Sequence, residues 1–441
     1  MSPEAEIRRR IGEQGRITFS EFMELALFWP QGGYYLSPGT LEASGDYYTS
    51  PQAHPAFAAL LAVQLLQMWS LLDEPDPFTV VEIGAGNGLL CRDLVAYSCH
   101  LPQAFRRALR YLCLDRNLAS GLEQEVFTGN GAAVGRVAAS IIASGPASTG
   151  QPEAAGLPLR GIRGCFLSNE LLDAFPVHQV TKVDGRLLEV YVTLRDGELA
   201  TVTAAPSTPM LVARLESLRV ELIEGQTAEI NLGIDSWARQ VAGALEAGFV
   251  LTIDYGHQAE ELYSAERRLR GTLTTYFRHT QTDSPLRRIG RQDITAQVDF
   301  TSAQELGEQA GLDVLGLTNQ SRFLGNLGLQ IYQERVLQQG LTRRQIQANR
   351  TAMMDLVRPG GLGDFKVLAQ GKNVGRPELW GFGSSGSSGF SKEAEAIARE
   401  LPVPVLSTGH LPLLESRFPH VEMEFDESWS LTGDVSHQER P

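Results

Sequence analysis

A glutamate and three glycines alternate in the stretch 79–88, whose sequence is Thr-Val-Val-Glu-Ile-Gly-Ala-Gly-Asn-Gly. Apolar β-branched residues begin the stretch and leucines at helical spacing follow it, which is typical of a buried strand that turns into a helix. Gly84, Gly86 and Gly88 lack the Cβ atoms that would keep a ligand away from the backbone. Glu82, at the strand end, would attract an amino group and repel a pyrophosphate. The stretch therefore predicts a site for a ligand that carries an amino group.

The spacing of the glycines separates this turn from a dinucleotide site. The dinucleotide fingerprint is G-x-G-x-x-G, whereas here the third glycine comes one residue early and Leu89 stands in its place. The pattern Glu-x-Gly-x-Gly-x-Gly resembles the first motif of class I S-adenosyl-L-methionine (SAM) methyltransferases. The resemblance implies SAM as the cofactor, with Glu82 and the three glycines in its site. NAD binding and a tight turn with incidental glycines are the alternatives.

Two further segments are predicted to contact the cofactor. Asp115 ends the next predicted strand, residues 109–114, where an acid can accept hydrogen bonds from both ribose hydroxyls of SAM. The alternative is an exposed aspartate at a strand end. Thr49 and Ser50 lie in a hydroxyl-rich loop ahead of an apolar helix expected over residues 56–72. We interpret these two residues both as a helix cap and as part of the cofactor site.

Carboxyl and amide groups follow two other predicted strands. Asn169, Glu170 and Asp173 come after one strand and Asp254 ends the other. Side chains just beyond the carboxyl ends of parallel strands face the ligand crevice, so we expect these four at the reaction centre as catalytic residues. Carboxylates suit an arginine acceptor, because they bind a planar guanidinium and can remove its proton. The alternative is a helix cap at Asn169 and a solvated first-turn acid at Glu170.

Several segments together identify a family. In chain order they are Ile-Thr-Phe-Ser-Glu-Phe-Met at 17–23, Gly-Tyr-Tyr at 33–35, Gly-Asp-Tyr-Tyr-Thr-Ser-Pro at 45–51, the glycine turn, and Asn-Glu-x-x-Asp-Ala-x-Pro-Val at 169–177. They are similar to the MidA-type methyltransferases, a family that includes the mitochondrial complex I assembly factor that methylates an arginine. The segment Asp-Ile-Thr-Ala-x-Val-Asp-Phe at 293–300 also resembles the family, and we interpret it as part of a lid over the substrate channel.

The resemblance implies a protein arginine N-methyltransferase that makes symmetric dimethylarginine on a partner protein, with a role in respiratory complex assembly. The partner would be a protein that presents an arginine. A methyltransferase for a small molecule and a non-catalytic assembly chaperone with the SAM fold are the alternatives. Methyl transfer from a sulfonium needs in-line positioning and carboxylates, so no metal is expected.

These residues require an α/β fold that brings strand ends together. We predict a Rossmann-like, seven-stranded class I methyltransferase core whose last strand, near 364–371, is antiparallel. A helical N-terminal cap is expected over 1–75 and the methyltransferase core over 76–371. The core contains a β-rich insertion at about 178–247, where two Asp-Gly pairs indicate hairpins. A linker and a C-terminal extension follow over 372–441.

Composition and charge bound the partners and the compartment. The 441-residue chain has a net charge of −14, which argues against binding nucleic acid or an anionic membrane surface. It has no apolar run long enough to span a membrane, so no membrane insertion is expected. The four cysteines form no C-x-x-C pair and are interpreted as reduced core residues. Without a signal or transit pattern, the sequence predicts a cytoplasmic protein.

Overall fold

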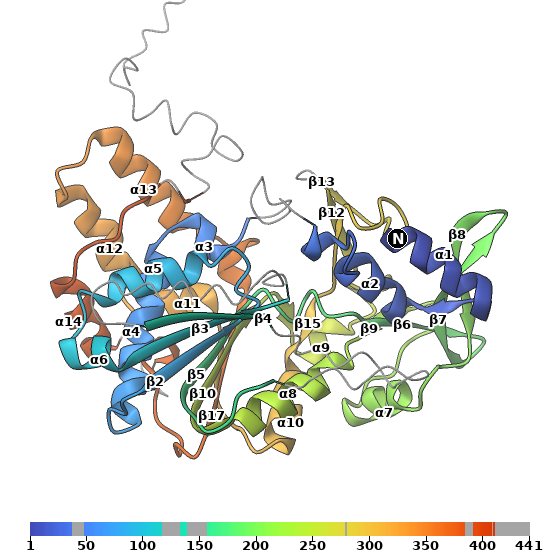
Figure 1. Ribbon diagram of the computed structural model, residues 1–441, viewed down its shortest axis with the longest axis horizontal. Coiled ribbons are helices and arrows are strands. Elements are labelled where there is room, and N and C mark those ends of the chain that lie inside the picture. Colours follow the sequence, from blue (N-terminus) through green and yellow to red (C-terminus); the bar gives the residue numbers. More distant parts are fainter. Residues whose placement is uncertain are drawn as a thin grey trace, which may run out of the picture.

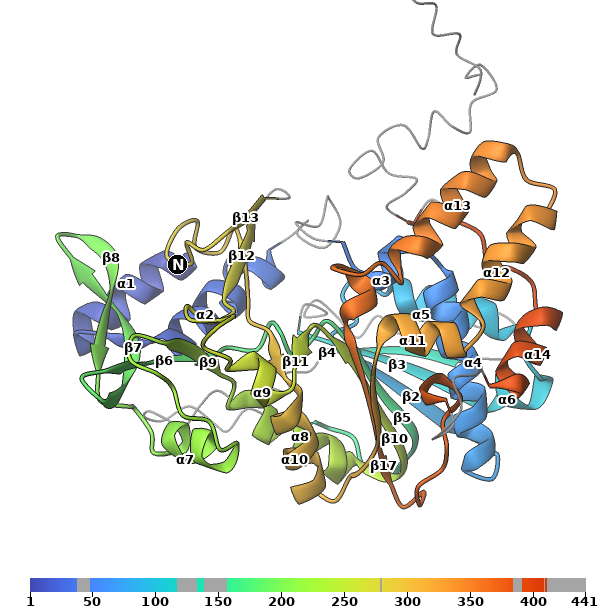
Figure 2. The ribbon, with the colours of Figure 1, turned by 180° about the vertical axis from the view of Figure 1, so that it is seen from behind.

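The computed structural model describes residues 1–37, 48–116, 133–138, 157–277, 280–383, 391–407 and 409–410. Residues 45–47 of the predicted hydroxyl-rich loop lie outside this set. The chain forms two lobes, a larger one around a mainly parallel sheet and a smaller one around an antiparallel sheet (Figure 1). Figure 2 shows the same two lobes from behind. Within the described residues, no helix is long and apolar enough to cross a membrane.

The larger lobe contains the predicted seven-stranded sheet, in the order β16-β17-β10-β5-β2-β3-β4. The strands are β2 (Phe78–Ile83), β3 (Leu109–Asp115), β4 (Ala133–Ala138), β5 (Ile162–Asn169), β10 (Leu245–Asp254), β16 (Asp313–Asn319) and β17 (Lys366–Lys372). Only β17 runs antiparallel to the other strands of this sheet. The carboxyl ends of β2, β3, β5 and β10 therefore meet at one edge. The predicted Rossmann-like class I fold is confirmed.

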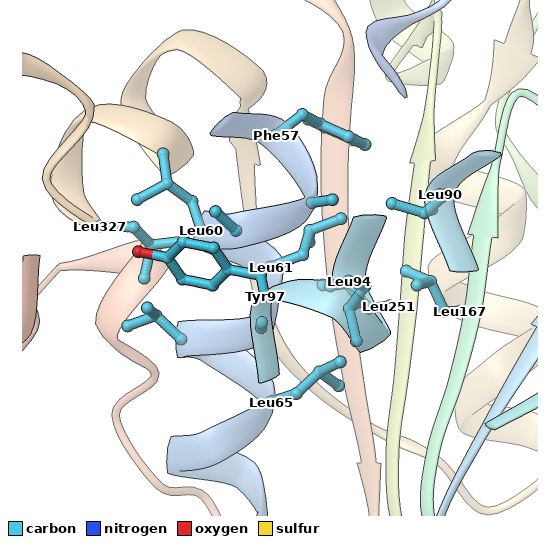
Figure 3. Close-up of a cluster of buried hydrophobic side chains, with 14 of the residues drawn as sticks. Phe57, Leu60, Leu61, Leu65, Leu90, Leu94, Tyr97, Leu167, Leu251 and Leu327 are labelled. Carbon is cyan, nitrogen blue, oxygen red and sulfur yellow. The ribbon is translucent and has the colours of Figure 1, made fainter. Parts of the chain in front are cut away.

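Helices cover both faces of this sheet, because its central strands alternate apolar side chains between two cores. Val80 and Leu167 contribute to one core, and their neighbours Val81 and Phe166 to the other. On the first face lie α3 (Ser50–Ala53), α4 (Ala56–Leu71), α5 (Leu89–Ser98) and α6 (Gln103–Ala108). On the second lie α8 (Gly233–Ala244) and α10 (Phe300–Gln309). Figure 3 shows leucines of α4 and α5 meeting Leu167 and Leu251 of the sheet.

C-terminal segments complete the first core. They include α11 (Gln320–Asn326), α12 (Leu329–Arg335), α13 (Arg343–Asp355) and α14 (Lys392–Glu400), with short 3-10 turns at Val336–Gln338, Leu362–Asp364 and Trp380–Phe382. The Tyr97 hydroxyl lies 2.7 Å from that of Tyr332 and donates to the Pro402 carbonyl at 2.9 Å. Ala394 and Ala398 of α14 are fully buried in the same core. The described residues after 371 therefore pack as part of the larger lobe.

The smaller lobe joins the N-terminus to the predicted insertion. Its sheet contains β1 (Ile17–Thr18), β6 (His178–Val183), β7 (Arg186–Arg195), β8 (Glu198–Ala204) and β9 (Thr227–Ile230). Helices α1 (Pro3–Gln14), α2 (Phe19–Phe28) and α7 (Met210–Ser217) accompany it. Both predicted Asp-Gly hairpin turns are present, because Asp184, Gly185, Asp196 and Gly197 have the positive φ angles that such turns require.

A third group consists of short strands and one short helix, and part of it packs on the smaller lobe, where Ile294 and Ala296 share a core with α1 and α2. It contains β11 (Gly256–His257), α9 (Ala259–Leu262), β12 (Thr274–Phe277), β13 (Thr280–Thr282), β14 (Asp293–Thr295) and β15 (Val298–Asp299). β1 pairs with β7, whereas α4 packs on the central sheet, so the range 1–75 contributes to both lobes. The division into a cap at 1–75, a core at 76–371 and an extension at 372–441 stays a prediction.

Candidate active site

A cavity of about 190 Å³ opens at the edge of the central sheet where the strand carboxyl ends meet. Its described lining comes from the glycine turn and the start of α5, the end of β3, the loop after β5, and the N-terminal segments near Tyr34 and Thr49. Of the predicted site residues, the lining includes Thr49, Glu82, Gly84, Gly86, Asp115, Asn169 and Glu170. The fold thus gathers most of them around one space.

The glycine turn has the backbone shape that its sequence predicts. Gly84, Gly86 and Gly88 have φ angles of +75°, +53° and +76°, a region that residues with a Cβ rarely adopt. A Cβ on Gly84 would lie 2.8 Å from the Leu171 side chain. Gly84 and Gly86 face the cavity, whereas Gly88 precedes the first residue of α5 and fixes the entry into that helix. Contact between Gly88 and the cofactor stays a prediction.

Two acids border the turn. The Gly86 N–H donates to Asp115 Oδ2 at 2.8 Å, so Asp115 holds the turn while facing the cavity. Glu82 is 4% exposed and accepts a hydrogen bond from the Tyr111 hydroxyl at 3.0 Å. Burial, followed by the charge of Glu82, raises the pKa of Tyr111 well above its usual value, which keeps this hydroxyl a donor. Both acids are therefore fixed in place by neutral donors.

Thr49 and Ser50 behave differently from each other. Thr49 lines the cavity, and its N–H donates to Gln52 Oε1 at 3.2 Å at the start of α3. The Ser50 hydroxyl is fully buried and donates to Gln320 Oε1 at 2.9 Å. The Ser50 backbone N–H bonds the Glu170 carboxylate instead. Ser50 therefore contacts a predicted catalytic acid, while its role in cofactor binding stays a prediction.

Glu170 is held in a strained conformation at the end of β5. Its φ angle is +52°, in the left-handed region that costs a residue with a Cβ about 1–3 kcal/mol. Its N–H donates to the Ile253 carbonyl at 2.9 Å, and Asn169 Nδ2 donates to its Oε1 at 3.0 Å. Burial and the neighbouring Asp173 raise the pKa of Glu170 to about 8. The carboxyl group is therefore held at the cavity in a strained and largely buried position.

Asp173 and Asp254 lie behind Glu170 and are not among the described lining residues. Asp254 Oδ2 accepts from the N–H groups of Leu171 and Leu172 at 3.1 and 2.8 Å, so this acid shapes the loop after β5. Burial, followed by the charge of Asp173, raises the pKa of Asp254 well above its usual value. Burial also raises the pKa of Asp173 to about 6, opposed by a hydrogen bond from the Tyr255 hydroxyl.

Sequence reasoning assigned no contact in the site to Tyr35 and Arg116, which line the cavity, or to Asp293 and Tyr276, which lie outside its described lining. Asp293 is fully buried, and its Oδ1 accepts a hydrogen bond from the Tyr35 hydroxyl at 2.8 Å. Tyr276 pairs with Asp293 in the β12–β14 register. The Arg116 guanidinium lies 4.2 Å from the centre of the Phe28 ring at the cavity wall. The only sequence signal for Asp293 was the segment at 293–300, which resembles the family. No local pattern indicates the contact of Asp293 with Tyr35, because the two residues are 258 positions apart.

The described residues fit SAM by their chemistry. The cavity offers a glycine backbone that a ligand can approach, carboxylates at Glu82 and Asp115, and apolar walls at Ile83 and Leu114. Such a mixture suits an amino acid and a ribose joined to an aromatic base. Among the described residues, no three His, Cys, Asp or Glu side chains are grouped to hold a metal ion. All four cysteines are free, and Cys91, Cys113 and Cys165 are buried.

Comparison with known proteins gives the same cofactor. A family model described as S-adenosyl-L-methionine-dependent methyltransferase matches residues 60–318. A COG1565 superfamily member from Burkholderia thailandensis, solved with S-adenosyl-homocysteine bound, is 28% identical with a TM-score of 0.73. The match covers 88% of this chain and 95% of that one.

Curated relatives carry an activity in their names. Protein arginine methyltransferase NDUFAF7 of Danio rerio is 30% identical over 71% of this chain and 74% of its own. The NDUFAF7 homolog of Drosophila melanogaster is 26% identical over 82% of this chain and 83% of its own. Both are named as mitochondrial proteins, and this finding contradicts the predicted cytoplasmic location.

Proposed function

Because the chain belongs to this family of S-adenosyl-L-methionine-dependent methyltransferases, we propose that it transfers a methyl group to an arginine side chain of a partner protein. Its cofactor is SAM. One observation carries the choice of acceptor: Glu170 lines the same cavity as the glycine turn, with Asp173 buried beside it. Two carboxyl groups next to the donor site suit a planar cation with several N–H donors.

The cofactor would lie along the carboxyl ends of β2 and β3. Asp115 would accept hydrogen bonds from the ribose hydroxyls, and the backbone at Gly84 and Gly86 would contact the ligand where no Cβ intervenes. Glu82 would bind the positive amino end through its buried carboxylate. When bound, SAM supplies a methyl group activated by its sulfonium.

Glu170 would orient the guanidinium and accept its proton. As the nitrogen–carbon bond forms and the sulfur–carbon bond breaks, the guanidinium nitrogen loses one N–H proton, so the methylated group keeps a single positive charge. A base with a pKa near 8 holds that proton well at neutral pH. Asn169 would position Glu170, because its amide donates to Oε1. Asp254 would keep the loop after β5 in the shape that this arrangement needs.

Symmetric dimethylation and a role in respiratory complex assembly remain proposals that the family resemblance suggests. The relatives' names support the arginine acceptor, and the net charge of −14 would favour a basic segment of the partner.

Labelled SAM tests the acceptor. The purified protein would be incubated with native partners captured from the same cell, and the labelled product would be hydrolysed to amino acids. We expect label in methylarginines, and none when Glu170→Gln replaces the unmodified protein. Label found only in methyllysine, in methyl esters or in a small metabolite would refute the arginine acceptor and leave the fold and the cofactor unaffected.

A further inference from the structure

Asp293 is a buried acid next to the catalytic loop that the proposed mechanism does not use. It begins β14 and is fully buried. Its Oδ1 accepts hydrogen bonds from the Tyr35 hydroxyl at 2.8 Å and from the Ile294 N–H at 2.9 Å. Two donors therefore hold this oxygen in place.

The end of β14 is attached to the loop that carries the catalytic acids. The Ala296 N–H, three residues beyond Asp293, donates to the Asp173 carbonyl at 3.0 Å. The charge of Asp293 contributes to the raised pKa of Glu170. Burial, followed by the charges of Asp173 and Asp293, raises the pKa of Tyr276. Asp293 is not itself among the described lining residues, but it holds the hydroxyl of Tyr35, which lines the cavity.

Asp173, behind Glu170, has one carboxylate oxygen without a donor in the described part of the chain. It is 5% exposed, and the Tyr255 hydroxyl donates to it. Its Oδ1 is buried and accepts no hydrogen bond from any described residue. A buried carboxylate oxygen without a donor is costly, and a cationic N–H group would remove that cost.

Tyr35 connects Asp293 to the smaller lobe. It lines the cavity, and its ring stacks on Phe28 with centroids 5.3 Å apart and planes at 20°. Tyr34 packs edge-on against it at 5.1 Å. Phe28 in turn lies under the Arg116 guanidinium. The aromatic contacts fix the ring, so the hydroxyl that holds Asp293 has little freedom to move.

We propose that Asp293, positioned by Tyr35, makes the acceptor pocket select a positively charged acceptor over a neutral one. The inference rests on the proposed function, because the acceptor is there an arginine. Asp293 acts on a cation bound beside Glu170: its buried negative charge stabilises that cation and disfavours a neutral group of the same shape. Tyr35 is a positioning residue, since it acts through Asp293.

Matched peptides test this selection. An arginine-containing peptide and its citrulline counterpart, which has nearly the same shape without the charge, would be titrated into protein saturated with S-adenosyl-homocysteine. We expect Asp293→Asn to weaken binding of the arginine peptide about tenfold and to leave the citrulline peptide unchanged. Tyr35→Phe should act in the same direction with a smaller effect. The exposed Asp283 supplies the control, because Asp283→Asn makes the same charge change nearby and should alter neither affinity.

A pH profile and SAM affinity separate this role from a structural one. Removing the negative charge of Asp293 should lower the apparent pKa of the rate in single turnovers, because that charge raises the pKa of Glu170. The affinity for SAM should stay unchanged, which also reports an intact fold.

The outcomes distinguish the two proposals. Arginine and citrulline peptides that bind Asp293→Asn as they bind the unmodified protein would overturn the inference and leave arginine methylation standing. If the unmodified protein binds a lysine peptide more tightly than the arginine peptide and Asp293→Asn loses that preference, the selection by charge stands and the arginine acceptor fails. An unmodified protein with no preference for either charged peptide would overturn both.

Discussion

The proposed cofactor end of the cavity is made mainly by the stretch 82–90, together with Thr49 and the end of the adjacent strand at Asp115. The acceptor end is assembled from separate elements: Glu170 and Asp173 follow β5, Asp293 begins β14, and Tyr35 belongs to a short 3-10 turn near the N-terminus. Tyr35 and Asp293 are 258 residues apart in sequence.

This contrast separates two kinds of binding. The cofactor end uses backbone shape and two fixed acids, and its contacts lie within one strand–turn–helix unit and its neighbour. The acceptor end uses buried charges, which are costly unless surrounding elements hold and pair them. We therefore expect substitutions at the first end to change SAM affinity and those at the second to change turnover and acceptor choice.

The largest effect is expected for Glu170→Gln. The amide keeps the shape of the side chain but cannot accept the proton, so turnover should fall by about 10²–10⁴-fold. SAM affinity should change little, because Glu170 lies at the acceptor end. Rapid-mixing single turnovers and calorimetry measure the two quantities. A variant that lost SAM affinity and kept its single-turnover rate would show that Glu170 belongs to the cofactor end and would refute the division into two ends.

Gly86→Val should break the cofactor end. Gly86 has a φ angle of +53° and faces the cavity, so a branched side chain would strain the turn and obstruct the ligand. SAM should bind more than about 100-fold more weakly, which corresponds to about 2.7 kcal/mol. Gly197→Val is the control, because Gly197 also has a positive φ but lies in a hairpin of the other lobe. Equal SAM affinity in Gly86→Val and the unmodified protein would refute this site.

A smaller loss is expected for Asp115→Ala. It removes a carboxylate that faces the cavity and also the acceptor of the Gly86 N–H. The dissociation constant of SAM should rise about tenfold or slightly more, because tenfold corresponds to about 1.4 kcal/mol and a charged hydrogen bond is worth roughly 1.5–3 kcal/mol. Calorimetry measures it, and the single-turnover rate at saturating SAM should be nearly unchanged. A slower rate at saturation would place Asp115 in the chemistry instead.

The smallest effect concerns how the free energy of unfolding depends on pH, and it tests the ionisation of Glu170. Its pKa is raised from the usual 4.5 to about 8 in the folded chain, so between these pH values the folded chain holds a proton that the unfolded chain has lost. This group therefore lowers stability progressively as pH rises from 4.5 to 8. Glu170→Gln should raise the free energy of unfolding by roughly 1–3 kcal/mol at pH 9 and by almost nothing at pH 4.

Chemical denaturation at the two pH values measures this difference. In the unmodified protein, turnover should increase with pH until Glu170 is ionised. A gain in stability that is the same at both pH values would show that relief from burial, and not ionisation, causes it.

The cofactor end could be predicted from the sequence because its geometry is local. The positive φ angles of Gly84, Gly86 and Gly88 need glycine, and a buried strand before a helix fixes where the turn lies. The two Asp-Gly hairpins follow from the same local rule, since residue type and turn shape determine each other. Asp115 could be placed beside the glycine turn because the second strand of such a sheet pairs beside the first, and its contact with the ribose stays a prediction.

The acceptor end could be predicted only in part. The motif at 169–177 gave Glu170 and Asp173, but only the packed structure distinguishes Glu170, which faces the cavity, from Asp254, whose oxygens bind backbone N–H groups. Nothing in the sequence around Tyr35 or Asp293 indicates that they touch. Their contact depends on how β14 and the N-terminal helices pack against the core, and such long-range packing is set by the whole chain. The sequence by itself therefore determined where the glycine turn lies, while the tertiary structure decided which acids lie around the cavity.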